Sequence, residues 1–264
     1  MRVIVTRPEP EASKWVASLT EAGVDAFALP LIEVGPASDS GPVIAAWEHL
    51  GTYDAVMFVS GNAVSHFFAL KPAKESVFSA QTAIKTRAFV TGPGTQSALL
   101  HVGAQIPWID APSHDAGQFD SEALWEVVGR RVGVGYRVLI VRGGGGVGGD
   151  APAGAGRDWF ASQVLAAGGL VDFVIAYHRS VPRWDARARQ AALKAVGDGS
   201  IWVFSSSEAI ANLQWALPEQ SWSQSRALAT HPRIAEAARN AGFAVVCESR
   251  PTLAALMASI ESMQ

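Results

Sequence analysis

Six turns in this sequence place hydroxyl, amide or guanidinium groups directly after short apolar runs. They are Thr6-Arg7, Ser60-Gly61-Asn62, Thr91 to Thr95, Arg142-Gly143, Ser205 to Ser207 and Thr230 to Arg233. Four of the six also open a helical pattern, and the free N–H groups and the dipole of a helix start attract anions. Arginine can hold a carboxylate through two hydrogen bonds, so carboxylates are suitable ligands. The substrate-binding candidates are Arg7, Ser60, Asn62, Thr91, Gly92, Thr95, Arg142, Gly143, Ser206, Thr230 and Arg233.

Each of these turns has a second interpretation, as the cap of a helix. Ser, Thr and Asn are common N-cap residues, and for a single turn capping is the simpler explanation. Four such turns in two similar halves of the chain, with Arg7, Arg142 and Arg233 beside them, instead favour a polyanion site. Ligands of open α/β sheets bind at the carboxyl ends of the strands, so we expect this site in a cleft between two lobes.

The segment Gly143-x-Gly145-x-x-Gly148 has the form of a dinucleotide-binding motif. The glycines continue past Gly149 to Gly156, so no helix opens at the third glycine, and we interpret the segment as a loop insertion. A nicotinamide-dependent enzyme that uses this loop is one alternative. The sequence has no P-loop, no His-Glu-x-x-His helix, no Gly-x-Ser-x-Gly turn and no metal-ligand spacing among its six histidines. We expect no metal and no cofactor, which leaves a cofactor-free enzyme or a binding protein.

Short apolar runs alternate with helical patterns along the chain, which is typical of a parallel α/β fold. Strands are predicted near 3–5, 27–34, 55–60, 87–91, 105–109, 137–142, 171–177, 201–205, 227–230 and 244–247. Helices are predicted between Pro10 and Gly23 and near 41–50, 62–70, 94–101, 118–129, 157–167, 184–196, 208–216, 232–241 and 252–262.

The chain also repeats itself. Residues 3–34 recur as 138–179, residues 55–64 as 201–210 and residues 88–104 as 227–243, in the same order. A repeat this long indicates a duplicated domain and not a solenoid unit. At 264 residues, the chain is long enough for two domains that each bury a core.

The boundary between the two lobes is expected in two equivalent strands. The predicted strands near 27–34 and 171–178 are each followed by a polar stretch that contains proline. Such stretches are natural crossing points between lobes. If both strands cross, the first lobe combines 1–35 with 173–264, and the second lobe is 36–172. A single cut near residue 135 fits the pattern equally well.

Composition excludes several classes of protein. A net charge of −3 provides no basic face in bulk for nucleic acid, and a single cysteine, Cys247, cannot form an intrachain disulfide. We found neither a run of eighteen apolar residues nor a signal peptide before the strand that starts at Val3. The sequence therefore predicts a cytoplasmic protein that contacts no membrane.

Seven short motifs together resemble one enzyme family, uroporphyrinogen-III synthase. They are VTRP (5–8), LPLIEV (29–34), VSGNAV (59–64), VTGPGT (90–95), LIVRG (139–143), VIAYHR (174–179) and HPRIAEAARNAGF (231–243). Each motif is weak alone, but their order and spacing match almost from end to end. The family tends to have Arg-Gly-x-Gly-Gly-Arg where this chain has Arg142-Gly143 and, after an insertion, Gly156-Arg157. Arg233 and Ile234 stand where some members carry threonines.

The resemblance implies an α/β fold of two flavodoxin-like lobes with parallel sheets, joined by a two-stranded β-ladder. It also implies a cofactor-free lyase of haem and tetrapyrrole biosynthesis. In that reaction hydroxymethylbilane closes to uroporphyrinogen III with loss of water and inversion of ring D. The substrate carries eight carboxylates, and the residues implied as donors to carboxylates are Ser60, Asn62, Thr95, Ser206 and Thr230.

Tyr177 is the one catalytic residue that the resemblance implies. It matches the family's tyrosine at the end of the second crossing strand, where its phenol could protonate or hydrogen-bond the departing hydroxyl. The alternative is that Tyr177 only packs where the lobes meet.

One alternative function comes from a different class of protein. It is a non-catalytic, two-lobed cytosolic binding protein for a polyanionic small molecule, which would show no turnover. Under the enzyme hypothesis the partner is a linear tetrapyrrole. Because this intermediate is unstable, transient contact with the enzyme that produces it is a further expectation.

Overall fold

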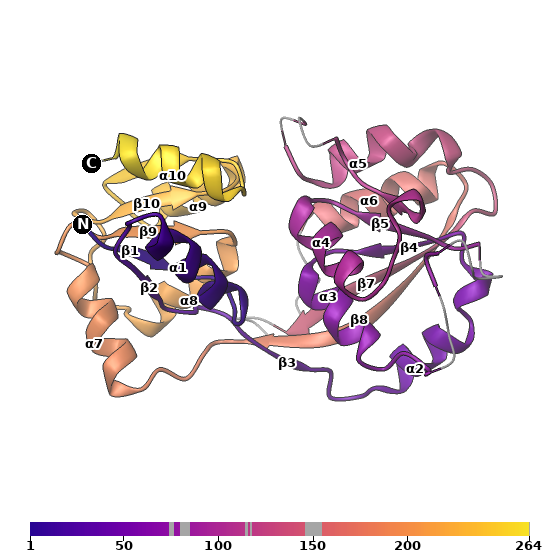
Figure 1. Cartoon of the computed structure of the whole chain (residues 1–264), viewed down its shortest axis with the longest axis horizontal. Helices are drawn as coiled ribbons and strands as arrows, with labels where there is room; N and C mark the ends of the chain where they lie inside the picture. Colours follow the sequence, from indigo (N-terminus) through magenta and orange to yellow (C-terminus); the bar gives the residue numbers. More distant parts are fainter. Residues whose placement is uncertain (74–76, 80–84, 114–115, 117, 146–154, 264) are drawn as a thin grey trace. The chain divides into compact units, whose positions relative to one another are not determined.

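The computed structural model describes residues 1–73, 77–79, 85–113, 116, 118–145 and 155–263 (Figure 1). These residues form two compact units. The first unit combines Met1–Val34 with residues 179–263, and the second combines Gly35–Gly145 with residues 155–178. No helix in the described ranges is long and apolar enough to cross a membrane.

The first unit is built on a five-stranded sheet in the order β11-β10-β9-β1-β2, with all neighbours parallel. Counted along the unit from the β2 edge, this is the order 2-1-3-4-5 of doubly wound folds. The strands are β1 (Val3–Val5), β2 (Ala26–Ala28), β9 (Ile201–Phe204), β10 (Arg226–Ala229) and β11 (Val245–Glu248). The helices are α1 (Glu11–Glu21), α7 (Ala186–Ala195), α8 (Ser207–Ala216), α9 (Pro232–Asn240) and α10 (Leu253–Ser262).

Both faces of this sheet are buried. Trp202 and Phe204 enter one apolar core, while Ile201 and Val203 enter a second core on the opposite face. A parallel sheet covered on both faces has continuous apolar strands, because alternate side chains meet a core on each side. This requirement explains the uninterrupted run Ile201–Phe204.

The second unit has a six-stranded sheet in the order β3-β8-β7-β4-β5-β6. The pairs β7-β4, β4-β5 and β5-β6 are parallel. The strands are β3 (Glu33–Pro36), β4 (Ala55–Phe58), β5 (Arg87–Val90), β6 (Ile109–Asp110), β7 (Arg137–Gly145) and β8 (Leu170–Ser180). The helices are α2 (Gly41–Glu48), α3 (Gly61–Phe68), α4 (Pro93–His101), α5 (Ser121–Val128) and α6 (Ala155–Ala166), with short 3₁₀ turns at Leu50–Thr52, Ile106–Trp108 and Gly129–Arg131.

The register of the strands shows the duplication directly. Ile201 of β9 pairs with a residue of β1 and one of β10, and Ala55 of β4 pairs in the same way with β7 and β5. The predicted α/β class with two parallel sheets is confirmed. Counting along the strands from these pairs makes Arg7 equivalent to Arg142, Ser206 to Ser60 and Thr230 to Thr91.

The strand predicted over 27–34 is two strands that belong to different sheets. β2 ends at Ala28 and β3 begins at Glu33. Pro30 lies between them and has no N–H to donate to a ladder. Side chains bind this segment instead, since Trp184 Nε1 donates to the carbonyl of Pro30 and Asn212 Nδ2 to that of Leu31. The strand predicted over 105–109 is similarly reduced to β6, because Pro107 lies in a 3₁₀ turn.

The chain passes between the units within β3 and within β8, which are hydrogen-bonded neighbours. The second passage lies at 178/179 and not at the predicted 172/173. The reason is that β8 belongs to the six-stranded sheet and continues to Ser180.

Candidate functional site

Polar residues from three neighbouring strand segments meet at the carboxyl edge of the second unit's sheet. Phe58, the last residue of β4, pairs with Val90 of β5 and with Val141 of β7. Ser60 and Thr91 follow their strands, and Arg142 comes directly after Val141 within β7, so the three residues share one edge. This is the edge at which parallel α/β sheets bind ligands. The turn predicted at Arg142-Gly143 is wrong, because β7 continues to Gly145.

Tyr177 of β8 joins this edge through a hydrogen bond to Ser60. The two hydroxyl oxygens lie 3.0 Å apart, although the residues are 117 positions apart in the sequence. Tyr177 is only 3% exposed. Two residues that the sequence named separately are thus brought together by the strand order β8-β7-β4.

The ring of Tyr177 lies close to Gly143 and to His66. A Cβ atom at Gly143 would lie 2.5 Å from Cε2 and Cζ of Tyr177, so only glycine leaves room for the ring. His66 of α3 stacks on the ring with centroids 5.6 Å apart and planes inclined by 23°. Burial lowers the pKa of His66 from its ordinary value, which favours the neutral imidazole.

Arg142 and the start of α4 supply groups suited to anions. The guanidinium of Arg142 lies 4.3 Å from the ring centroid of Phe173 and, among the described residues, forms no ion pair with a carboxylate. Gly92 is the N-cap of α4 and offers no side chain to its first N–H groups. Thr95, three residues into the helix, is buried.

The first unit carries the equivalent edge of its own sheet. Thr6 Oγ1 donates to the carbonyl of Val203 at 2.7 Å, and the N–H of Thr230 donates to that of Phe204 at 3.1 Å. Ser206 caps α8 by accepting the N–H of Glu208 at 3.2 Å. Arg233 is exposed at the second position of α9 and makes no ion pair within the described ranges.

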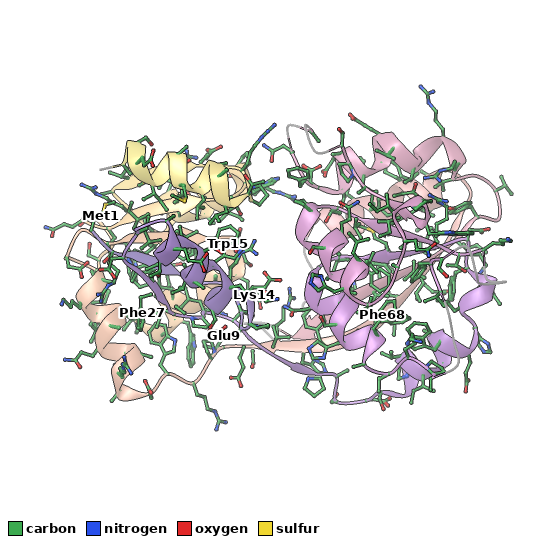
Figure 2. The ribbon with its side chains drawn as sticks, viewed as in Figure 1. Met1, Glu9, Lys14, Trp15, Phe27 and Phe68 are labelled. Atoms are coloured by element: carbon green, nitrogen blue, oxygen red, sulfur yellow. The ribbon has the colours of Figure 1, made fainter. Side chains whose placement is uncertain are left out.

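Arg7 differs from its equivalent Arg142 because its charge is compensated. Arg7 Nη1 donates to Glu11 Oε2 at 2.6 Å, and the guanidinium lies 4.3 Å from the ring centroid of Trp15. Trp15, on α1, is labelled in Figure 2. Burial lowers the pKa of Arg7, and the adjacent carboxylate of Glu11 opposes that shift. The side chain of Arg7 is therefore held in place by Glu11 and Trp15, which belong to the same unit.

Sequence reasoning missed the partners that hold the candidates in place. It named neither Phe173 nor Trp15 as a contact of an arginine, and it considered His66 only as one of six histidines without metal-ligand spacing. Only the spacing of four residues between Arg7 and Glu11 could have indicated one of these contacts, the ion pair of Arg7. Of the Gly143–Gly149 loop, residues from 146 onward lie outside the described residues, as does the Arg157 side chain. β7 continues through Gly145, so the first three glycines of the predicted loop belong to a strand.

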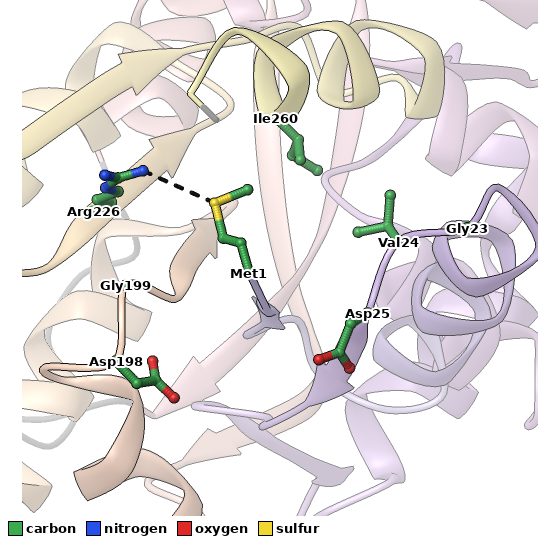
Figure 3. A pocket seen from close by; sticks show the side chains of 8 residues that line it. All are labelled: Met1, Gly23, Val24, Asp25, Asp198, Gly199, Arg226 and Ile260. Atoms are coloured by element: carbon green, nitrogen blue, oxygen red, sulfur yellow. Dashed lines mark hydrogen bonds between the residues drawn. The ribbon is translucent and has the colours of Figure 1, made fainter.

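A cavity of about 620 Å³ lies at the opposite edge of the first unit's sheet (Figure 3). It is lined by Met1, Gly23, Val24, Asp25, Asp198, Gly199, Arg226 and Ile260, none of which is a site candidate. Its polar groups are engaged, since Asp25 binds Arg2, Asp198 binds Ser200, and Arg226 binds the carbonyl of Met263. The described residues also contain no group of three or more His, Cys, Asp or Glu that could hold a metal ion.

Known proteins resemble this chain in sequence and in structure. A family model described as Uroporphyrinogen-III synthase HemD matches residues 13–258. The porphyrin biosynthesis protein HemD of Ruminiclostridium josui is 27% identical over 139 residues, which are 53% of this chain and 26% of that protein. The chain thus spans about a quarter of the length of this curated relative.

Two solved structures share the fold. A mutant uroporphyrinogen III synthase from the extremely thermophilic bacterium Thermus thermophilus gives a TM-score of 0.55 at 15% identity, over 100% of this chain and 98% of that one. The uroporphyrinogen-III synthetase of Helicobacter pylori 26695 gives 0.56 at 14% identity, over 100% of both chains. At these identities the likeness establishes the fold alone.

Proposed function

Because the chain belongs to the uroporphyrinogen-III synthase HemD family, we propose that it closes hydroxymethylbilane to uroporphyrinogen III. The reaction removes water and inverts ring D, which makes the enzyme a lyase. The structural observation that carries the proposal is the pair of hydroxyls from Ser60 and Tyr177, 3.0 Å apart. It supports a proton donor at the edge where a ligand of this fold binds.

In the proposed reaction Tyr177 acts as the general acid. The hydroxyl of the hydroxymethyl group leaves with the C–O bonding pair and takes the phenol proton, which forms water. The pyrrole nitrogen stabilises the remaining carbon as an azafulvene cation. The substituted carbon of ring D then attacks this cation and forms a spiro intermediate. The bond from that carbon to the bridge of ring C breaks, its electron pair returns to ring D, and a second azafulvene cation remains on ring C. The unsubstituted carbon of ring D attacks this second cation, and loss of the proton from that carbon restores the pyrrole. A positioned acid contributes on the order of 10²- to 10⁴-fold to such a step.

Holding the substrate in the attacking geometry is the larger task. Unguided closure joins the unsubstituted carbon of ring D and gives the uninverted isomer, so the enzyme has to favour the more hindered attack. Fixing a linear chain in a near-attack geometry can contribute about 7–11 kcal/mol. The carboxylates of the substrate are the groups by which the protein can hold it.

Arg142 is the proposed carboxylate clamp of the second unit. Its guanidinium makes no ion pair among the described residues, and its contact with Phe173 leaves its donors available. Thr91, Asn62 and the uncapped start of α4 at Gly92 and Thr95 are proposed as further donors. In the first unit the proposed donors are Thr230, Ser206 and Arg233.

Two of the candidate residues take a different role in the light of these contacts. Gly143 is proposed to serve the site by making room for Tyr177. Arg7 is proposed to order the turn after β1, because its charge is already paired with Glu11. We further propose that the enzyme works in the cytoplasm without a cofactor, and that the enzyme that makes the linear tetrapyrrole is a transient partner.

The test is an isomer analysis. Purified protein is mixed with freshly generated hydroxymethylbilane without any added cofactor, and the products are oxidised and separated by chromatography. We expect isomer III to dominate. Isomer I alone, from folded protein, would refute the proposal and would favour a binding protein for a polyanion.

A further inference from the structure

The hydrogen bond between Ser60 and Tyr177 has two possible directions with different chemical consequences. If the phenol donates to Ser60, its proton is occupied and unavailable to a leaving group. If Ser60 donates, the phenol keeps its proton free. The 3.0 Å separation of the oxygens fits either direction, so the other contacts of Ser60 have to decide.

The backbone of α3 occupies one acceptor site of Ser60. Ser60 is the N-cap of this helix, and its Oγ accepts the N–H of Ala63 at 3.1 Å. A hydroxyl has one proton and two acceptor lone pairs. Accepting a hydrogen bond polarises the hydroxyl and makes it a stronger donor. The cap therefore favours donation from Ser60 to Tyr177.

The ring of Tyr177 is held in a fixed plane while this bond forms. Gly143 leaves space for Cε2 and Cζ, and His66 stacks against the ring. Because the ring is 3% exposed, it has little room to reorient. The phenol oxygen is consequently presented to Ser60 in one position.

We propose that Ser60 is a positioning residue that directs the proton of Tyr177 toward the substrate. The chain runs from the Ala63 N–H to Ser60 Oγ and from the Ser60 hydroxyl to the Tyr177 oxygen. When the leaving hydroxyl takes the phenol proton and departs as water with the C–O bonding pair, the Ser60 hydroxyl stabilises the phenolate that remains. This inference rests on the proposed function, in which Tyr177 is the acid.

The duplication supplies a matched control. Ser206 holds the equivalent position and caps α8 in the same way, by accepting a backbone N–H. Within the part of the chain that the structure describes, its hydroxyl has no tyrosine partner. Ser60→Ala and Ser206→Ala therefore remove the same kind of cap, and only Ser60→Ala removes a contact with Tyr177.

The experiment is a kinetic double-mutant cycle on the full chain. We expect Ser60→Ala to lower kcat about tenfold or more with little change in KM, in line with the loss of a positioned acid. Ser60→Thr should restore most of the activity, because threonine keeps the hydroxyl. Tyr177→Phe should lower kcat by at least as much. Adding Ser60→Ala to Tyr177→Phe should lower kcat no further. Thr252→Ala, which removes the hydroxyl cap of α10 and lies outside the candidate residues, should leave kcat near the wild-type value. Thermal unfolding should show that losing any of these caps costs similar stability.

Two outcomes of the cycle would overturn the inference. Independent losses in the double variant would show that Ser60 does not act through Tyr177. A rise in KM without a fall in kcat would assign Ser60 to carboxylate binding.

A spectroscopic measurement separates this inference from the proposed function. In protein labelled with 3-fluorotyrosine, the ¹⁹F resonance of Tyr177, assigned with Tyr177→Phe, should move in Ser60→Ala and stay in place in Ser206→Ala. An unmoved resonance in Ser60→Ala overturns the positioning role even if isomer III is formed. Isomer I alone from the wild type overturns the proposed function, whatever the resonance does.

Discussion

The close approach of Gly143 to the ring of Tyr177 allows the effect of a substitution to be predicted from distances. In Gly143→Ala the new Cβ would lie 2.5 Å from Cε2 and Cζ of Tyr177, whereas ordinary contacts begin at 3.4 Å. The ring would have to move by about 0.9 Å, the difference between these two distances. A displacement of about 1 Å at a reacting group can cost on the order of a hundredfold in rate. Overpacking of this kind also costs about 1–3 kcal/mol of folding free energy.

Steady-state kinetics and chemical denaturation of Gly143→Ala measure both effects. Gly35→Ala is the matched control, because Gly35 also lies in a strand of the same sheet and a Cβ there would meet nothing within 4 Å. We expect kcat to fall roughly a hundredfold in Gly143→Ala and to stay near wild type in Gly35→Ala. If Gly143→Ala folded and turned over at the wild-type rate, the argument that the Tyr177 ring is fixed would be refuted.

Two further predictions concern the arginines and His66. Arg142→Gln should raise KM on the order of tenfold, the usual loss of a charged hydrogen bond, whereas Arg7→Gln should leave KM unchanged and lower the free energy of unfolding by about 1 kcal/mol. Equal KM effects in steady-state assays would contradict this division. Burial lowers the pKa of His66 in the folded state, so the unfolded state binds the proton more readily. The free energy of unfolding should therefore rise as the pH increases up to 6.5, the ordinary pKa of histidine. Denaturation at several pH values should show a weaker dependence for His66→Phe, which keeps an aromatic ring against Tyr177, and an unchanged dependence would speak against the burial of His66.

Five of the six predicted polar turns follow parallel strands, because strand and helix signals are local, whereas Arg142 and Gly143 lie within β7. Ser60 and Ser206 each precede a helix, and both cap it, so the capping interpretation and the site interpretation concern the same hydroxyls. What the sequence could not show is which turn meets which strand. The contact of Ser60 with Tyr177 depends on β8 and β7 lying beside β4, which is a property of the whole sheet.

Two other features of the structure, the break between strands at Pro30 and the ring partner of His66, were not predicted from the sequence. The run from 27 to 34 is apolar enough for one strand, but Pro30 interrupts the ladder, and the two parts join different sheets. Similarly, the sequence shows His66 only as a histidine in a predicted helix, and the packed structure shows that its ring partner is Tyr177.

The duplication separates the residues that a fold requires from those that chemistry requires. Serine at 60 and at 206 is explained in both copies by the helix that follows, so a serine at this position is not by itself evidence of a site. Arg7, after β1, and Arg142, within β7, are also equivalent, yet only Arg7 has an acidic partner four residues on. In both pairs the difference lies in the neighbours and not in the residue itself. Among the described residues, Tyr177 hydrogen-bonds Ser60 and not Ser206, and Glu11 pairs with Arg7 while Arg142 has no such partner. The second unit is therefore where the proposed proton donor, Tyr177, shares one edge with Arg142, which pairs with no carboxylate among the described residues. We expect substitutions there to affect turnover more than the same substitutions in the first unit.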